Sequence, residues 1–248
     1  MFEEIIKFKA PKEYIDSLDK NLYPKPIKLN IPDWYKHLKH TGKDQTIKGC
    51  MPFLDTLTTG YILSIPQESH FHWEYNKQDN KESEGYRFSF KDTFVGDINL
   101  NSGESIGNEL HSPRQIEGSD LNNKSKFPVY KFLNPWTIET PPGYSCLLVS
   151  PLNNSDKRFS IISGIVDTDT YNSPINFPFI INKKIIEDNE ILIKQGTPYV
   201  QVIPFKRKNW KMKIEEISKE KLFSFNLNFK SIIYQNYKNK IWKKKNYK

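Results

Sequence analysis

Short apolar runs separated by turn residues dominate the chain from residue 49 onward. In the first half they fall at 61–65, 71–75 and 86–90, with Pro, Gly, Asn and Asp between them. Further runs follow at 136–140, 145–150, 159–162, 175–181, 190–193 and 199–203. Runs this short, rich in β-branched and aromatic residues, are typical of strands. No long helical patterns alternate with them, as a parallel α/β sheet would require. The pattern predicts a mainly β fold whose body, from 49 to 206, is a compact barrel.

The stretches outside these runs predict loops and an N-terminal arm. Residues 76–84 and 96–126 are polar, with Asn, Gly, Ser and Lys throughout, and are expected to be loops, the second long enough to have a role of its own. Residues 1–48 are polar and punctuated by proline, which favours extended chain. Two short helices are expected there, one after Pro11 and one after Pro32. We therefore predict a Pro-rich arm over 1–48.

The C-terminal residues 207–248 predict a basic helical tail. From residue 206 to the end there are 14 Lys and Arg against 3 acidic residues, so the rest of the chain is mildly acidic. Ile233, Tyr237 and Ile241 recur at four-residue spacing, which is one apolar stripe of a helix with lysines opposite. This stripe is expected to pack on the body or on a neighbouring subunit.

The tail also admits a nucleic-acid hypothesis. Lysines release counterions when they contact phosphates, and an interleaved aromatic ring can stack on a base. The residues for such a contact are Lys240, Trp242, Lys243, Lys244 and Lys245.

Composition narrows the function classes. The formal net charge is +8, and the two cysteines, Cys50 and Cys146, are too few for a disulfide framework. No apolar run reaches 18 residues, and the acidic start lacks the basic and apolar regions of a signal peptide. A membrane protein, a membrane-bound partner and a typical secreted protein are not expected. The 33 Lys, 22 Asn and 28 Ile, with a single Ala, indicate an AT-rich coding sequence, so that a lysine here need not imply a bound phosphate.

One strand carries residues that could begin a metal site. His70, His72 and Glu74 alternate along the run, so they share one face of a strand. A cupin-type site also needs a later histidine at the start of another strand, but the last histidine is His111, in a predicted loop. In the competing interpretation, His70, His72 and Glu74 lie on the solvent-facing side of the strand, and Phe71, Trp73 and Tyr75 are turned inward. No metal or cofactor is expected from this strand.

Two aspartates and a tyrosine follow a predicted strand at alternate positions. Asp167, Asp169 and Tyr171 lie in Gly164-Ile-Val-Asp-Thr-Asp-Thr-Tyr171. Two other distinctive segments flank it in the sequence. They are Asn134-Pro-Trp-Thr-Ile-Glu-Thr-Pro-Pro-Gly-Tyr-Ser145 and Lys194-Gln-Gly-Thr-Pro-Tyr-Val-Gln-Val-Ile203.

The order of these segments resembles the dUTPase and dCTP deaminase family. Thr59-Gly-Tyr-Ile-Leu63 is similar to the opening segment of that family. The resemblance implies a β-clip barrel, usually a trimer with sites between subunits. It also implies Asp167 as the base that activates water, with Asp169 beside it, and Tyr171 as a platform for deoxyribose. Arg158 and Gln201 would contact the ligand, and Mg²⁺ would accompany a bound nucleotide.

The phosphate-binding parts of that family depart from its pattern here. Its Arg-Ser-Ser-Leu segment is replaced by Ser150-Pro-Leu-Asn-Asn-Ser-Asp-Lys-Arg158, and no glycine follows Gly196, so the Gly-rich phosphate arm has no counterpart. A pyrophosphatase without these ligands is not expected to work. Whether the chain is an enzyme is therefore left open, and the departures favour a non-catalytic protein.

The span from 51 to 207 also resembles an uncharacterised family of tailed phages and marine bacteria. The phrases that carry this resemblance are Asn134 to Ser145 and Val166-Asp-Thr-Asp-Thr-Tyr171. It implies a phage-type source, in keeping with the AT-rich codons, and a location in the cytoplasm of a host cell or in a virion.

Three functions follow from the sequence. The first is a non-catalytic structural or assembly protein on a dUTPase-like β scaffold, in which the arm and tail reach other subunits or partners of a homo-oligomer. The second is a deoxynucleotide-binding or -hydrolysing protein that uses Asp167 and Tyr171. The third is nucleic-acid or polyanion binding through the Lys-rich tail.

Overall fold

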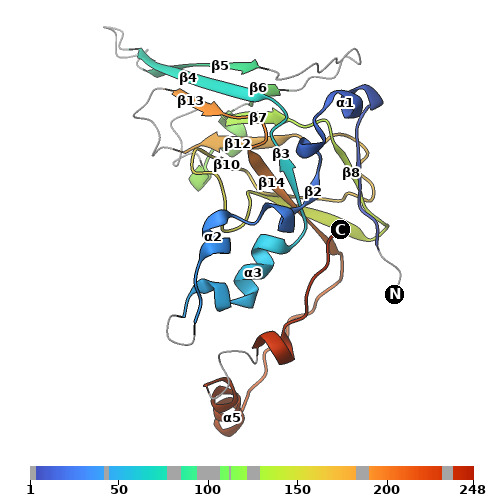
Figure 1. The fold of residues 1–248 in the computed structure, drawn as a ribbon, viewed down its shortest axis with the longest axis vertical. Helices are drawn as coiled ribbons and strands as arrows, with labels where there is room; N and C mark the ends of the chain where they lie inside the picture. Colours follow the sequence, from blue (N-terminus) through green and yellow to red (C-terminus); the bar gives the residue numbers. More distant parts are fainter. Residues whose placement is uncertain are drawn as a thin grey trace.

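The structure is a computed structural model that describes residues 4–41, 45–76, 85–93, 107–111, 113–121, 129–182, 190–230 and 237–248. Antiparallel β-sheets make up most of it, with few helices, as the short apolar runs predict (Figure 1). Every pairing between its described strands is antiparallel.

The described strands form four sheets. Their strand orders are β1-β8, β10-β12-β7-β6, β11-β9-β14-β3-β2 and β13-β4-β5. The first-half strands are β1 (Lys7–Lys9), β2 (Lys25–Pro26), β3 (Tyr61–Ser64), β4 (Glu68–Asn76), β5 (Gly85–Thr93), β6 (Gly107–His111) and β7 (Val129–Leu133). The second-half strands are β8 (Thr137–Glu139), β9 (Tyr144–Val149), β10 (Phe159–Ile161), β11 (Gly164–Val166), β12 (Phe177–Ile181), β13 (Glu190–Ile193) and β14 (Pro198–Lys206).

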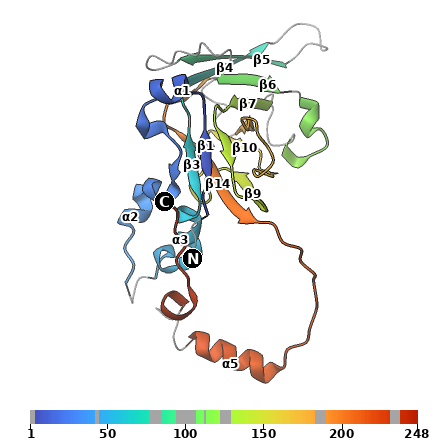
Figure 2. The same ribbon diagram turned by 90° about the vertical axis from the view of Figure 1, so that its right-hand side faces the viewer.

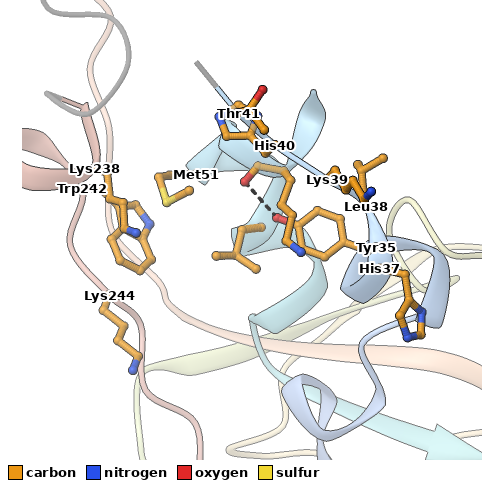
Figure 3. Close-up of a pocket in the computed structure, with 12 residues that line it drawn as sticks. Tyr35, His37, Leu38, Lys39, His40, Thr41, Met51, Lys238, Trp242 and Lys244 are labelled. Carbon is orange, nitrogen blue, oxygen red and sulfur yellow. Dashed lines mark hydrogen bonds between the residues drawn. The ribbon is translucent and has the colours of Figure 1, made fainter. Parts of the chain in front are cut away.

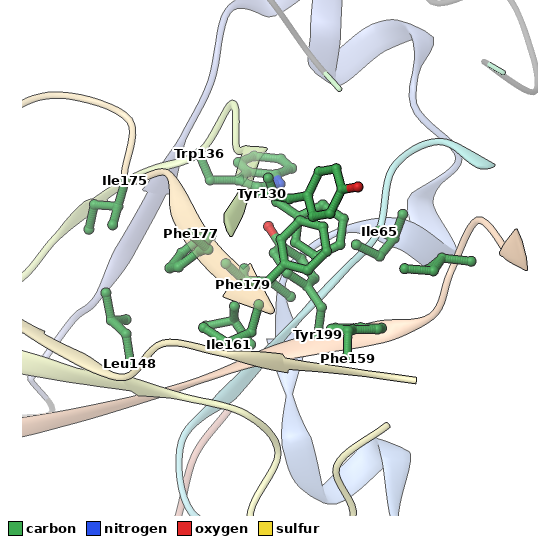
Figure 4. Packing of buried hydrophobic residues seen from close by; sticks show 14 of the residues in the cluster. Ile65, Tyr130, Trp136, Leu148, Phe159, Ile161, Ile175, Phe177, Phe179 and Tyr199 are labelled. Carbon is green, nitrogen blue, oxygen red and sulfur yellow. The ribbon is translucent and has the colours of Figure 1, made fainter. Parts of the chain in front are cut away.

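One hydrophobic core joins these sheets (Figure 4). Its centre is aromatic: the rings of Phe132 and Phe179 stack with their centroids 3.9 Å apart. Tyr130 stacks on Phe179 from one side, and Phe71 meets the rings of Tyr130 and Phe179 edge-on. Offset and edge-to-face pairs of this kind add to the stabilisation that burial alone gives.

The N-terminal segment is packed into this core. Strand β1 pairs with β8, where Lys7 and Lys9 both contact the carboxylate of Glu139. Tyr14 and Leu18 are buried in the same cluster as the aromatic centre. Described residues of the predicted Pro-rich arm 1–48 therefore pack on the β-sheets, and the boundary at 48 stays a prediction.

The helices are short. Both expected N-terminal helices are present, as α1 (Lys12–Ser17) and α2 (Asp33–His37). Helix α3 (Met51–Thr58) was not predicted, because its apolar residues fall in the stretch assigned to the β body; Pro52 in its first turn suits a helix start. Helix α5 (Lys219–Lys230) and a helical turn over Tyr237–Ile241 lie in the C-terminal part.

The prediction of an uninterrupted loop over 96–126 is wrong in part. Strand β6 lies within it and pairs with β7, and a 3₁₀ turn follows at Pro113–Ile116. The neighbouring strand β7 supplies the pairing that a polar sequence on its own does not reveal.

The C-terminal residues leave the body and return to it (Figure 2). After β14 the chain runs without regular structure through 207–218 before α5 begins. At its end, Trp242 and Lys245 contact Asp55 on α3, and the rings of Tyr247 and Tyr61 meet edge-on. The predicted helical tail is thus helical only at α5 and at Tyr237–Ile241 within its described residues. Of the predicted stripe, Ile241 is exposed and Ile233 lies outside the described residues.

None of the helices in the described residues combines the length and the apolar character that crossing a membrane demands.

Candidate functional site

The four segments that carry the sequence resemblance meet in one sheet. Strands β11, β9, β14 and β3 are consecutive neighbours. Strand β11 holds the start of segment 164–171, and β9 follows the Pro141-Pro-Gly143 turn. Strand β14 holds the second part of segment 194–203, and β3 holds the second part of segment 59–63. Segments 59–63 and 194–203, far apart in the chain, pair directly through β3 and β14.

Asp169 is held by Arg207 and by the Pro-Pro-Gly turn. Its carboxylate accepts a hydrogen bond from the backbone N–H of Gly143 at 2.8 Å. Both terminal nitrogens of the Arg207 guanidinium contact it, with Nη1 at 2.9 Å from Oδ1. The hydrogen bonds from Arg207 and then from Gly143 lower the pKa of Asp169 to about 2. Its side chain is 6% exposed, so Asp169 ties the end of β11 to the end of β14 and is closed to a ligand.

Asp167 is oriented but open. Its Oδ1 accepts a hydrogen bond from the Ser145 hydroxyl at 2.7 Å and lies 3.3 Å from Nη1 of Arg207. The side chain is 61% exposed. Asp167 and Tyr171 also line one surface pocket of about 570 Å³, together with Ile165 and Lys131. The structure therefore brings together the predicted base and the predicted ring platform.

Arg158 and Gln201 lie away from this pocket and are already engaged. The guanidinium of Arg158 contacts Asp156 through Nε at 2.9 Å and Nη2 at 2.6 Å, and Nη1 contacts the carbonyl of Leu192. Its hydrogen bonds with Asp156 raise the pKa of Arg158.

Gln201 is buried on β14 and links three backbone groups. Its Nε2 donates to the carbonyls of Thr56 at 3.1 Å and Thr59 at 2.7 Å, and its Oε1 accepts from the N–H of Leu152 at 2.9 Å. Gln201 therefore holds the end of α3 against the turn after β9, and no polar atom of its side chain faces solvent.

The His70 strand presents its histidines outward. Phe71 and Trp73 are buried, as expected, while His70 is exposed and its Nε2 lies 3.1 Å from Glu190 on the adjoining strand β13. His72 is on the same side as His70, and the side chains of Glu74 and Tyr75 lie outside the described residues. Within the described residues, no three His, Cys, Asp or Glu side chains gather as metal ligands would.

The predicted nucleic-acid residues divide into two groups. Trp242 donates from Nε1 to both carboxylate oxygens of Asp55, at 3.0 and 3.1 Å, and Lys245 contacts the same carboxylate. Lys243 and Lys244 are exposed, and the side chain of Lys240 lies outside the described residues.

Sequence reasoning missed the second pocket to which this segment contributes. Lys238, Trp242 and Lys244 line it together with residues between Tyr35 and Leu54 (Figure 3). Because the two stretches lie almost at opposite ends of the chain, no local pattern connects them. In the sequence, only the basic charge of residues 207–248 indicated that this segment contributes to a binding site.

The Asp169 contacts predict how stability depends on pH. The pKa of Asp169 is about 2 in the folded chain and about 3.9 for an ordinary aspartate, so its ionised form stabilises the fold. That contribution is complete above about pH 5 and is lost as the pH falls toward 2. In thermal melts, the Tm difference between the wild type and Asp169→Asn should be largest near neutral pH and shrink between about pH 4 and pH 2.

Two points make this measurement specific. Glu139, whose contacts with Lys7 and Lys9 lower its pKa to about 2, titrates in the same window in both proteins and cancels in the difference. Asp16→Asn, at an exposed position on α1, is the control and should show little difference at any pH. A wild-type to Asp169→Asn difference that stays constant from neutral pH to pH 2 contradicts the prediction.

Comparison with known proteins yields a structural likeness. No family model and no curated protein matches the chain. Among solved structures, the native EIAV dUTPase is similar over 60% of this chain and 98% of its own, at 13% sequence identity and a TM-score of 0.29. The function of this chain is therefore inferred from its own residues.

Proposed function

We propose that this chain is a non-catalytic structural or assembly protein of phage type, built on a β-clip scaffold like that of dUTPases. It associates with further copies of itself through residues 208–218, here called the C-terminal arm. The observation that carries the proposal is the exposure of large apolar side chains on this arm. Trp210, Met212 and Ile214 are 90%, 84% and 87% exposed.

The arm has the pattern of a strand that lacks a sheet. Its apolar residues fall at alternate positions, with Lys211 and Lys213 between them, so one face of an extended segment is apolar and the other is basic. Burying an apolar side chain of this size contributes about 1.5–3 kcal/mol. An extended segment of this kind is suited to pairing with the edge of a sheet.

The β body has exposed edge strands with which the C-terminal arm of another copy can pair. Ile165 on β11 and Leu110 on β6 are 65% and 59% exposed, and Leu192 on β13 is exposed as well. All three strands are edges of their sheets among the described strands. Edge strands in monomeric proteins are commonly protected from further pairing. Exposed apolar residues on these edges support the view that another copy covers them.

The contacts around the aspartates favour a scaffold over a hydrolase. Arg158 is engaged by Asp156, and Arg207 is engaged by Asp169, so neither guanidinium is free to bind a nucleotide phosphate. Asp167 and Tyr171 share a pocket, which supports deoxynucleotide binding as a second candidate function. In that case Mg²⁺ would accompany the phosphates, since neither of these arginines is available to neutralise them.

The experiment is a measurement of mass in solution by sedimentation velocity over a range of concentrations. The wild type is expected to sediment as an oligomer, with a trimer as the expected species. The triple variant Trp210→Ser, Met212→Ser, Ile214→Ser should shift to the monomer, because the apolar face of the arm is removed.

The matched control is Lys208→Ser, Lys211→Ser, Lys213→Ser, which changes the same arm on its basic residues and should keep the oligomer. A wild type that is monomeric at every concentration overturns the proposal, as does an apolar variant that associates as strongly as the control.

A further inference from the structure

A basic pocket lies where the C-terminal end of the chain returns to the N-terminal third (Figure 3). Its volume is about 870 Å³, within the range of small-molecule sites. Residues 238–244 lie across the pocket from the stretch that contains and follows α2, and α3 adds Met51 and Leu54 to the lining. The residues that line this basic pocket are Tyr35, His37, Leu38, Lys39, His40, Thr41, Lys48, Met51, Leu54, Lys238, Trp242 and Lys244.

The Lys and His side chains that line the basic pocket are all basic. Four lysines and two histidines line it, and none of its lining residues is acidic. Lys48 donates to the backbone carbonyl of Lys36 at 2.7 Å, which leaves its ammonium with further donors. The carboxylate of Asp55 on α3 is engaged by Trp242 and Lys245 and does not line the pocket. A concave site with cations from three separate segments attracts an anion more strongly than scattered surface lysines do.

The basic pocket also offers a ring surface. The hydrogen bonds from Trp242 Nε1 to the Asp55 carboxylate fix the indole by its edge, and the half-buried ring lines the pocket, where a base can stack on it. Apolar side chains of Leu38, Met51 and Leu54 contribute the rest of the lining. An acidic peptide would use the lysines but has no need of the ring, whereas a nucleotide uses both, since every base has a flat face that stacks on an aromatic side chain.

We infer that the basic pocket binds a nucleotide unit, with the base against Trp242 and the phosphates on Lys39, Lys238 and Lys244. The same chemistry is presented by single-stranded nucleic acid and by a free nucleotide. This site is separate from the C-terminal arm and from the pocket of Asp167 and Tyr171, so it stands or falls independently of the proposed function.

The test uses the full chain and fluorescence anisotropy of a short labelled oligothymidylate, with thymidine triphosphate as competitor. The wild type should bind the strand, and the slope of log K against log salt should become shallower by about 2 in Lys39→Gln, Lys238→Gln, Lys244→Gln, at about 0.7 for each phosphate that a lysine no longer neutralises. The control Lys208→Gln, Lys211→Gln, Lys219→Gln removes the same charge from exposed positions outside the pocket and should keep the wild-type slope.

The ring is tested by two variants of one residue. Trp242→Ala should weaken binding of the strand about five- to a hundredfold, the range for one base stack, and Trp242→Phe should recover most of the affinity although it cannot bond Asp55. Thermal melts establish that both variants are folded. If thymidine triphosphate displaces the strand at a similar concentration, counted per nucleotide, the ligand is a free nucleotide. If thymidine triphosphate competes only weakly, the ligand is the strand.

Three results overturn the inference. The first is that neither the strand nor the nucleotide binds. The second is that the two triple lysine variants weaken binding equally, which reduces the effect to net charge. The third is that polyglutamate binds as tightly as the strand while Trp242→Ala has no effect, which assigns the pocket to acidic protein segments.

Discussion

Gly60→Ala is expected to lower the free energy of unfolding by about 2–5 kcal/mol, because the substitution adds a steric clash to an unfavourable backbone angle. Gly60 has a φ of +83°, and a Cβ atom there would lie 2.1 Å from the carbonyl oxygen of Val202. That oxygen belongs to the backbone of the central strand β14, so it cannot move aside as a flexible side chain would. For a chain of this length the change corresponds to about 5–20 °C in Tm.

Gly118→Ala separates the two causes. Gly118 has a similar φ of +77°, but a Cβ there would meet no atom within 4 Å. It should therefore show the backbone strain alone, about 1–2 kcal/mol. Differential scanning calorimetry of both variants checks the comparison. Equal destabilisation at the two glycines would show that β14 relaxes around the new atom and that close approach does not explain Gly60.

Gln201→Met is expected to cause the second large destabilisation, about 3–6 kcal/mol, since three buried backbone groups are left without their partners. The carbonyls of Thr56 and Thr59 and the N–H of Leu152 all bond the Gln201 amide. Methionine has a similar length and fills the same space, so the effect comes from unpaired polar groups and only slightly from packing. Urea unfolding should show a lower midpoint with an unchanged m-value.

Gln195→Met is the comparison for this variant. Gln195 is only partly buried, and its Nε2 donates to the carbonyl of Pro66 at 2.9 Å. We expect Gln195→Met to be destabilised less than Gln201→Met, because groups at a partly exposed position can bond to water after the substitution. A Gln201→Met variant as stable as Gln195→Met would mean that water replaces the amide inside the fold.

The strands could be predicted from the sequence wherever one face of a strand is buried. The alternation in 71–75 predicted the correct inward side, with Phe71 and Trp73 buried and His70 exposed. Strand β6 could not be predicted in this way, because polar residues with no apolar alternation pair with β7 there. Helix α3 is eight residues long, too short for its period to be distinguished from a buried strand in the sequence.

The candidate site could be predicted only where its residues are close in sequence. Asp167 and Tyr171 were expected to share a face of an extended strand; they do line one pocket, but through a turn in which the Tyr171 N–H donates to the Asp167 carbonyl at 2.9 Å. Arg207, whose hydrogen bonds lower the pKa of Asp169, lies 38 residues further along the chain, and no pattern in the sequence was a reason to assign it a role. Lys39 and Lys238 line the basic pocket although they lie near opposite ends of the chain. Interactions of this range depend on the assembled sheets and leave no periodic signal.

The return of the chain's end to α3 has a mass-action consequence. Arg207 on Asp169 anchors one side of the C-terminal excursion, and Trp242 with Lys245 on Asp55 anchors the other. While the backbone is continuous, the second anchor forms within one molecule, at an effective concentration that can reach the millimolar range for a flexible connection. In a monomer, where no other copy covers the C-terminal arm 208–218, a single proteolytic cut in this arm would turn that anchor into a bimolecular interaction. At protein concentrations below the Kd of that interaction the severed end would then dissociate, and one wall of the basic pocket would leave with it.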